Sequence, residues 1–294
     1  MVELSLSKKI KSYFNEAVKI DYDGSSNIHP IIILNSLKNI LGDNRKDPSK
    51  EILDCMEEII GKHTKRKDDK DLLNNIAKEC VGLTVFTSDL EDACQDGEIL
   101  KMENAAARLQ WVSENGLGVF EVLLEVALQD FHRLGTFSYH LQRANHFSQE
   151  QEFLWSYNRC LLKEISKEPL PEPHEKVDMK YDFRISNNNK QIVPLSSANR
   201  LWDGNYIRIN GIRRELSHWY ASLEFEFVND SKTINGLEEY VENGGNLFIE
   251  CAEELIKHPN FEIKIIELEA IRFFLKKAPK KDYPIIAKHL ERFL

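Results

Sequence analysis

The spacing of apolar residues changes at one proline-rich segment, and this change constrains the fold more than any other feature of the sequence. The segment is Glu168-Pro-Leu-Pro-Glu-Pro-His174. Each proline fixes its own φ angle and disfavours helix at the preceding residue, so the segment predicts a stiff, extended linker. Before it, apolar residues repeat with a helical period, whereas directly after it they fall at every second position. We therefore predict a helical domain over residues 1–168, a linker over 169–176 and a second domain over 177–294.

The first 168 residues carry a succession of amphipathic patterns with recognisable helix ends. Pro30 fits the first turn of a helix, and Gly42 fits the position that caps its end. Between them, five apolar residues lie at helical spacing, namely Ile33, Leu34, Leu37, Ile40 and Leu41. A second pattern starts after Pro48 and stops at Gly61, and a third follows one helix face over residues 120–134. These patterns predict an N-terminal bundle of several helices.

The residues after the linker alternate between apolar and polar side chains, as strands do when one face meets water. The clearest alternation covers residues 177–186, and another covers 219–227. The stretch 190–195 is predicted to return as a strand between them. We therefore predict a small antiparallel β-meander over about 177–228, followed by C-terminal helices from Thr233 onward. The resulting fold class is α+β, predominantly α.

Composition and charge narrow the classes of partner. The 294 residues include 48 Asp and Glu against 39 Lys and Arg, which gives a formal net charge of -9. This balance argues against a broad electrostatic footprint on nucleic acid or on an anionic membrane. The five cysteines form no Cys-x-x-Cys pair, and the sequence shows neither a signal peptide nor an apolar run that spans a bilayer. We therefore expect reduced thiols, a cytoplasmic location, no cofactor, no metal, and a protein partner or a homo-oligomer.

One cluster of titratable residues lies at the end of the longest amphipathic pattern. Arg133 and His140 are seven residues apart, so a continuous helix would place them on nearly one face. Such a pair can cleave RNA, because the histidine exchanges the proton of a 2′-hydroxyl while the arginine stabilises the charge on the phosphate. The segment Arg133-Leu-Gly-Thr-Phe-Ser-Tyr-His140 resembles the Arg-x(4–6)-His motif of the HEPN ribonucleases, although Leu134 stands where that family usually has a polar residue. The resemblance implies a dimeric, metal-independent endoribonuclease with Arg133 and His140 as catalytic residues.

Two other interpretations of this cluster stay open. A carboxylate–histidine metal site in a helical bundle needs a Glu-x-x-His pair on each of two helices. Neither Glu121 nor Glu125 has a histidine three residues beyond it, so we predict no metal site. The other interpretation, which we favour, is the solvated face of an amphipathic helix. That face would carry Glu125, Gln129, Arg133, Thr136, His140 and Arg143.

Basic and aromatic residues gather again in the predicted meander. Arg208, Arg213 and Arg214 follow Trp202 within a dozen residues. Side chains of these kinds can stack on and neutralise a single-stranded nucleic acid. Residues 177–228 are nearly neutral, however, with seven Lys and Arg against six Asp and Glu. We therefore predict a mixed surface, on which these four residues are the candidates for ligand binding.

No motif of high specificity names a reaction. The sequence contains no glycine-rich phosphate loop, no G-x-S-x-G elbow and no H-E-x-x-H. We therefore expect a helical protein–protein interaction module, such as an adaptor or a regulatory subunit of an intracellular complex. The first alternative is the metal-independent endoribonuclease, the only interpretation that brings RNA as a partner. The second is a ligand-sensing protein with a pocket between its two domains.

Overall fold

The computed structural model describes residues 5–79, 84–113, 117–178, 185–225 and 237–293. Within these ranges the chain forms fifteen α-helices and no strand, and one isolated antiparallel bridge pairs Ile20 with Lys65. The helices before the proline-rich segment are α1 (Leu6–Ala17), α2 (Pro30–Leu41), α3 (Lys50–Gly61), α4 (Asp69–Glu79), α5 (Thr87–Asp96), α6 (Ile99–Val112), α7 (Leu117–Ala127), α8 (Thr136–Ser148) and α9 (Leu154–Ile165). Those after it are α10 (Asn189–Trp202), α11 (Ile209–Ala221), α12 (Leu237–Asn243), α13 (Leu247–Leu255), α14 (Phe261–Lys277) and α15 (Tyr283–Leu290).

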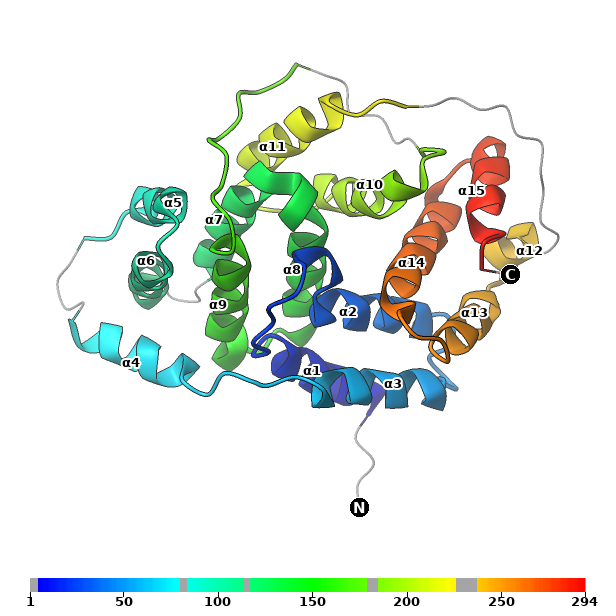
Figure 1. The fold of residues 1–294 in the computed structure, drawn as a ribbon, viewed down its shortest axis with the longest axis horizontal. Helices are drawn as coiled ribbons and strands as arrows, with labels where there is room; N and C mark the ends of the chain where they lie inside the picture. The colour runs from blue at the N-terminus through cyan, green and yellow to red at the C-terminus, as the bar shows by residue number, and fades with distance from the viewer. Residues whose placement is uncertain (1–4, 80–83, 114–116, 179–184, 226–236, 294) are drawn as a thin grey trace.

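Four helices from distant parts of the chain surround the centre of the protein. Helix α2 packs against α8 and α14, and α10 packs against the same two helices, so the four close a ring (Figure 1). Helix α2 is apolar on nearly all sides, and ten of its twelve residues are buried. The ring joins helices from both sides of the proline-rich segment, and their buried apolar residues belong to one continuous core. The domain boundary at 169–176 stays a prediction.

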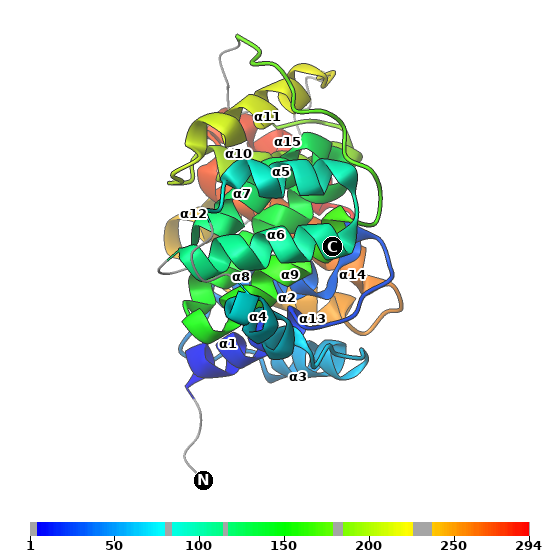
Figure 2. The ribbon, with the colours of Figure 1, turned by 90° about the vertical axis from the view of Figure 1, so that its left-hand side faces the viewer.

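The remaining helices form layers around this ring. Helices α1 and α3 pack against α2, while α13 and α15 pack against α14. On the other side, α9 lies between α8 and the pair α6 and α7. Figure 2 looks onto α4, α5 and α6, which form the outer layer there. No helix in the described ranges has the length and apolar character that a membrane crossing requires.

The predicted β-meander, and with it the α+β fold class, is wrong for the described residues. Helix α10 occupies the predicted strand over 190–195, and α11 continues to Ala221, inside the predicted strand over 219–227. On α11, Ile212, Leu216 and Trp219 are buried at helical spacing. The apolar residues of this region are therefore also compatible with a helix, and in the structure they form one. Residues 179–184 and 226–228 of the predicted meander lie outside the described ranges.

The helices predicted from clear end signals are confirmed. Helix α2 begins at Pro30, and Gly42 is its C-cap residue. Helix α3 begins two residues after Pro48 and ends at Gly61. In both cases local residues specify the helix start: Pro30 occupies the first turn of α2, and the Ser49 side chain after Pro48 caps α3 by accepting from the Ile52 N–H.

The amphipathic pattern over 120–134 does not form one straight helix. Helix α7 ends at Ala127, and a 3-10 turn (Leu128–Asp130) and a π-helical turn (Phe131–Gly135) precede α8. These turns change the number of residues per turn, so the faces of α7 and α8 are out of register. The predicted solvated face is wrong, because its residues do not share one face and because Arg208 and Arg214 cover Glu125. Four of its residues are buried, namely Glu125, Gln129, Thr136 and His140.

Candidate functional site

A pocket of about 630 Å³ opens between α7, α8, the start of α9 and the loop that joins α10 to α11. This volume lies in the range of small-molecule sites, roughly 300–1,000 Å³. Residues 118–154 form most of the wall, and residues 205–207 complete it. Both sides of the proline-rich segment therefore contribute to one pocket.

Helix α8 supplies one wall of this pocket through a single face. Gln142, Asn145, His146 and Gln149 all line the pocket. Their spacing of three, four and seven residues places them on the same side of an α-helix. Gln149 has a positive φ of 52° and ends the helix, with its backbone N–H donating to the carbonyl of Asn145 at 3.0 Å. Three carboxamides and an imidazole thus line one wall in a row, and we call this cavity the amide-lined pocket.

Tyr206 forms part of the opposite wall and is held there by a glycine. A Cβ atom at position 204 would overlap the Tyr206 ring, so only Gly204 permits the ring to lie against the backbone at this point. Burial raises the pKa of Tyr206, which keeps its hydroxyl protonated and able to donate a hydrogen bond. Ile207, at the rim, is 88% exposed. The loop therefore presents an aromatic ring and an apolar rim to the pocket.

The charged groups of this pocket are two carboxylates. Glu121 accepts a hydrogen bond from the backbone N–H of Arg208 at 3.0 Å, and Glu150 accepts one from the Asn15 amide. Among the described residues, no Lys or Arg lines the pocket. The buried Oε1 atom of Gln142 has no hydrogen-bond partner in the described part of the chain. The lining therefore suits an uncharged ligand rich in hydrogen-bonding groups and disfavours an anion.

The structure places Arg133 in a network of backbone carbonyls. Its guanidinium pairs with Asp130 at 2.7 Å and donates to the carbonyls of Glu164 at 2.7 Å and Glu168 at 3.2 Å. Glu164 lies in the last turn of α9 and Glu168 just beyond it, where backbone carbonyls lack helical partners. The observed contacts give Arg133 a structural role in tying α9 to the π-helical turn.

His140 lies elsewhere, in the ring of central helices. It is 1% exposed, and its Nδ1 accepts a hydrogen bond from the Asn35 amide at 2.9 Å. Burial lowers the pKa of His140 to about 3, so the imidazole is neutral at physiological pH. Arg133 and His140 share no hydrogen-bond partner in the described residues. A nuclease role for the pair would need an opening of the core that this geometry does not contain.

The four predicted binding residues form two separate pairs. Arg208 and Arg214 both pair with Glu125, at 2.5 and 3.1 Å, and so link α7 to α11 and the turn before it. The Arg213 guanidinium lies 5.1 Å from the centre of the Trp202 ring and donates to the Trp202 carbonyl at 3.1 Å. The three arginines thus contact groups of the fold itself, and none of the four residues lines the amide-lined pocket.

The sequence did contain a signal for the pocket. Gln142, Asn145, His146 and Gln149 repeat at helical spacing, and hydrogen-bonding side chains in such a row are a pattern to search for. A search for titratable residues does not find this row, because carboxamides do not titrate. The contribution of Tyr206 had no local signal, because it depends on how the loop packs against α7 and α8.

Comparison with protein-family models, with curated proteins and with solved structures finds no match to this chain. Among the described residues, no group of three His, Cys, Asp or Glu side chains is arranged to hold a metal ion. Any statement of function therefore depends on the geometry of the pockets and surfaces themselves.

Proposed function

We propose that this chain is a ligand-binding protein whose amide-lined pocket takes a neutral, polyhydroxylated small molecule such as a sugar. The observation that carries the proposal is the row of Gln142, Asn145, His146 and Gln149 along one wall of a ligand-sized pocket. Each carboxamide offers both donors and an acceptor, which matches the mixed donor and acceptor character of hydroxyl groups. The proposal corresponds to the ligand-sensing alternative, with the pocket formed from both sides of the proline-rich segment.

The other residues of the pocket support the same class of ligand. Phe120, Leu124 and Leu154 provide apolar surface, and Tyr206 adds an aromatic ring with a protonated hydroxyl. Sugars present both C–H faces and hydroxyl edges, so they use apolar and polar walls together. The carboxylate of Glu121 accepts a hydrogen bond from the backbone N–H of Arg208 and has further lone pairs for a ligand hydroxyl.

The test is a binding screen with neutral mono- and disaccharides on the full chain. We expect at least one of them to raise the melting temperature, because a ligand that binds only the folded state stabilises it. The hit is then titrated by calorimetry against Asn145→Leu. Removing an amide that pairs with the ligand is expected to weaken binding about tenfold or more.

Asn74→Leu is the matched control. Asn74 is exposed on α4 and does not line the pocket, so the same chemical change there should leave the affinity unaltered. If no sugar shifts the melting temperature, or if the hit binds Asn145→Leu as tightly as the wild-type chain, the proposal fails.

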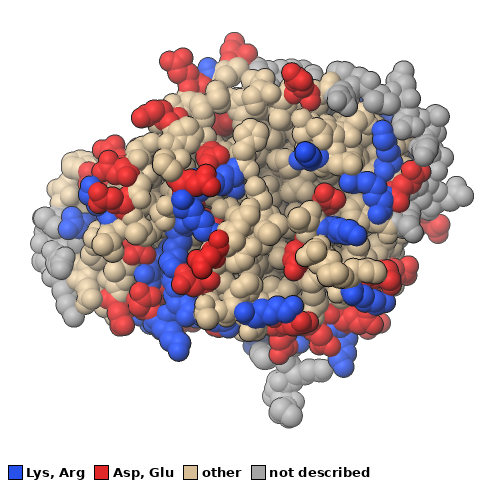
Figure 3. Space-filling model, viewed as in Figure 1, with Lys and Arg blue, Asp and Glu red and all other residues tan. Residues whose placement is uncertain are grey.

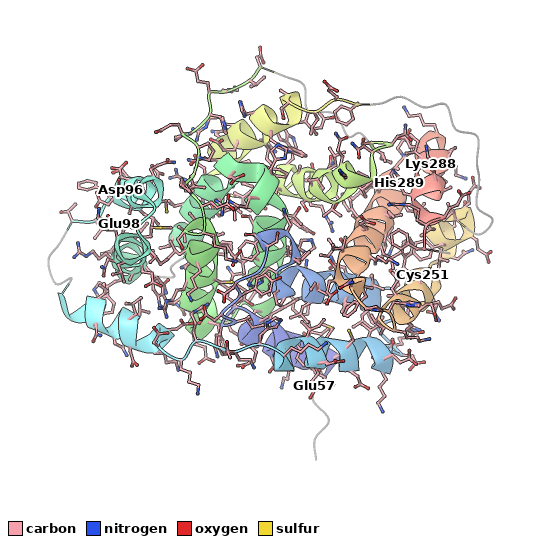
Figure 4. All side chains as sticks on the ribbon, in the orientation of Figure 1. Glu57, Asp96, Glu98, Cys251, Lys288 and His289 are labelled. Atoms are coloured by element: carbon pink, nitrogen blue, oxygen red, sulfur yellow. The ribbon has the colours of Figure 1, made fainter. Side chains whose placement is uncertain are left out.

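A second candidate function is protein association through the outer face of α6. Leu100 is 70% exposed and Trp111 is 53% exposed, although both are large apolar residues. They are eleven residues apart, which places them three turns apart on one face of the helix. Exposed Trp and Arg side chains are typical anchors of protein interfaces. Asp96 and Glu98, at the junction of α5 and α6, lie at the outer edge of the molecule (Figure 4).

The charges on α5 and α6 favour a second copy of the chain as the partner. Asp92 on α5 and Arg108 on α6 are exposed, and neither has an ion-pair partner in the described residues. A two-fold axis brings the same patch of both copies together, so Arg108 of one copy can meet Asp92 of the other. This form of association corresponds to the homo-oligomer, one of the two kinds of protein partner expected from the sequence.

Sedimentation equilibrium on the wild-type chain tests this second candidate. We expect a concentration-dependent dimer that Trp111→Ser converts to a monomer, whereas Ile263→Ser, a similar change at an exposed apolar residue of α14, leaves it intact. Arg108→Asp should weaken the dimer, and adding Asp92→Arg should restore it. A chain that stays monomeric at all concentrations contradicts this candidate.

A further inference from the structure

A second pocket, of about 460 Å³, carries the opposite charge to the amide-lined one. It lies between the end of α1, the segment that leads into α4, and the start of α9. Its lining includes five cationic residues, namely Lys19, Lys65, Arg66, Lys67 and Lys70. It also includes three carboxylates, namely Glu16, Asp69 and Glu152. The pocket is thus locally basic in a chain of net charge -9.

Backbone pairing brings the cations together from two parts of the chain. The N–H of Arg66 donates to the carbonyl of Lys19 at 2.8 Å, and the N–H of Asp21 donates to that of Thr64 at 3.0 Å. These bonds form the isolated antiparallel bridge between Ile20 and Lys65. The ammonium groups of Lys19 and Lys65 then share Glu16, at 3.3 and 2.8 Å.

The floor of this basic pocket is formed by ion pairs that already satisfy one another. Arg66, whose side chain is 4% exposed, pairs with Asp69 at 3.1 Å and donates to the Val18 carbonyl at 2.9 Å. Arg159 from α9 pairs with the same carboxylate at 2.7 Å. The Ser156 hydroxyl also donates to Asp69, at 2.6 Å. Because Asp69 is occupied by these partners, it does not neutralise the lysines at the mouth.

Two of the lysines that line the basic pocket have no partner for their positive charge among the described residues. Lys67 and Lys70 are exposed, and neither has a hydrogen bond or an ion pair with any described residue. In Figure 3, Lys and Arg form a band over α9 and the segment that enters α4. On the other side of the pocket, the Lys19 ammonium lies 4.8 Å from the centre of the Phe153 ring. Within the described chain, the pocket therefore carries two unpaired lysines on one side, and an aromatic ring beside the paired Lys19 on the other.

We propose that this basic pocket binds a small phosphate ester, with the phosphate at Lys67 and Lys70 and a planar apolar group against Phe153. Lysine is a point-charge ligand for phosphate, and a dianion gains most where several ammonium groups converge. Glu16 and Asp69 do not cancel this attraction, because each has two cationic partners. The third carboxylate of the lining, Glu152, is a single negative charge against Lys67 and Lys70. This site is separate from the amide-lined pocket and does not depend on the function proposed for it.

The probes are AMP, adenosine and inorganic phosphate, titrated separately by calorimetry into the full chain. We expect AMP to bind more tightly than either of its parts, since only AMP offers both the charge and the planar group. Lys67→Gln combined with Lys70→Gln is expected to weaken AMP binding about tenfold or more, because two charge-assisted contacts are lost. Raising the salt concentration should also weaken it.

The matched control is Lys46→Gln combined with Lys50→Gln. These two lysines are exposed and make no ion pair with a described residue, and they do not line the basic pocket. The control removes the same net charge, so it should leave AMP affinity within about twofold of the wild type. The proposal is overturned if AMP binds no more tightly than adenosine, or if both double variants bind AMP equally well.

Discussion

The carboxylate of Glu269 holds the guanidinium of Arg200 in a two-point ion pair at the centre of the protein. The two Nη–Oε distances are 2.7 and 2.9 Å, and Glu269 is 1% exposed. The Asn39 amide adds a hydrogen bond to the same carboxylate at 2.8 Å, and the guanidinium lies 4.3 Å from the centre of the Tyr139 ring. One buried carboxylate thus links α14 to α10 and α2, three of the four helices of the central ring.

We predict that breaking this pair destabilises the whole fold. Arg200→Leu leaves the Glu269 charge buried without its main partner, which costs about 3–5 kcal/mol of unfolding free energy. Urea unfolding followed by circular dichroism measures the loss. The double variant Arg200→Leu with Glu269→Leu removes both charges and should recover most of the stability. A single variant that unfolds at the same urea concentration as the wild-type chain would refute the prediction.

The buried histidines predict a loss of stability at mildly acidic pH. Burial lowers the pKa of His140 from 6.5 to about 3, and it also lowers the pKa of His29 and of His289. His289 lies on α15 and contacts the Ser186 carbonyl at 2.8 Å. Between pH 6.5 and 3 the unfolded chain therefore binds more protons than the folded one. The stability contributed by His140 is fully present above pH 6.5 and is lost as pH falls.

Urea unfolding at pH 7.5, 6 and 5 tests this dependence. His140→Gln should reduce the slope of the unfolding free energy against pH. The reduction is up to about 1.4 kcal/mol per pH unit, the value for one proton. His258→Gln, at an exposed position on the α13–α14 turn, serves as the control and should leave the slope unchanged. Equal slopes for the wild-type chain and His140→Gln would contradict the prediction, because they would show that His140 binds its proton equally in the folded and unfolded chains.

Gly204→Ala should disturb the amide-lined pocket. The added methyl group overlaps the Tyr206 ring, so the ring must leave its place on the wall. Forcing an atom into a packed position costs about 1–3 kcal/mol. We expect a lower melting temperature and weaker sugar binding. Gly61→Ala is the control, because a Cβ there meets nothing within 4 Å and should be neutral or slightly stabilising.

Arg133→Ala should lower stability by about 1–3 kcal/mol, because it removes the donors to the carbonyls at the end of α9. Chemical denaturation measures this effect. The same variant tests the endoribonuclease alternative when it is assayed with single-stranded RNA in EDTA. An RNA-cleaving activity of the wild-type chain that is lost in both Arg133→Ala and His140→Ala would favour that alternative over the structural role.

Local signals were sufficient to predict some helices of this fold and insufficient for others. Helices α2 and α3 carry proline at the start, glycine at the end and an apolar face between, so each feature of the sequence points to the same element. In α10, Pro194 lies inside the helix, where proline ordinarily removes a backbone hydrogen bond. That single residue favours a strand edge in the sequence, yet the packing of α10 against α8 and α14 outweighs it.

The sequence by itself determined the ends of α2 and α3 and the apolar face that each of them buries. Only the tertiary structure decided whether the region after the proline-rich segment forms strands or helices. Residues four apart, such as Ile212 and Leu216, share a face in a strand and in a helix alike, so their pattern does not choose between the two. The choice depends on burial against α7 and the 3-10 and π-helical turns, contacts that are distant in sequence. The same long-range packing placed His140 in the core and brought Tyr206 opposite the amide row of α8.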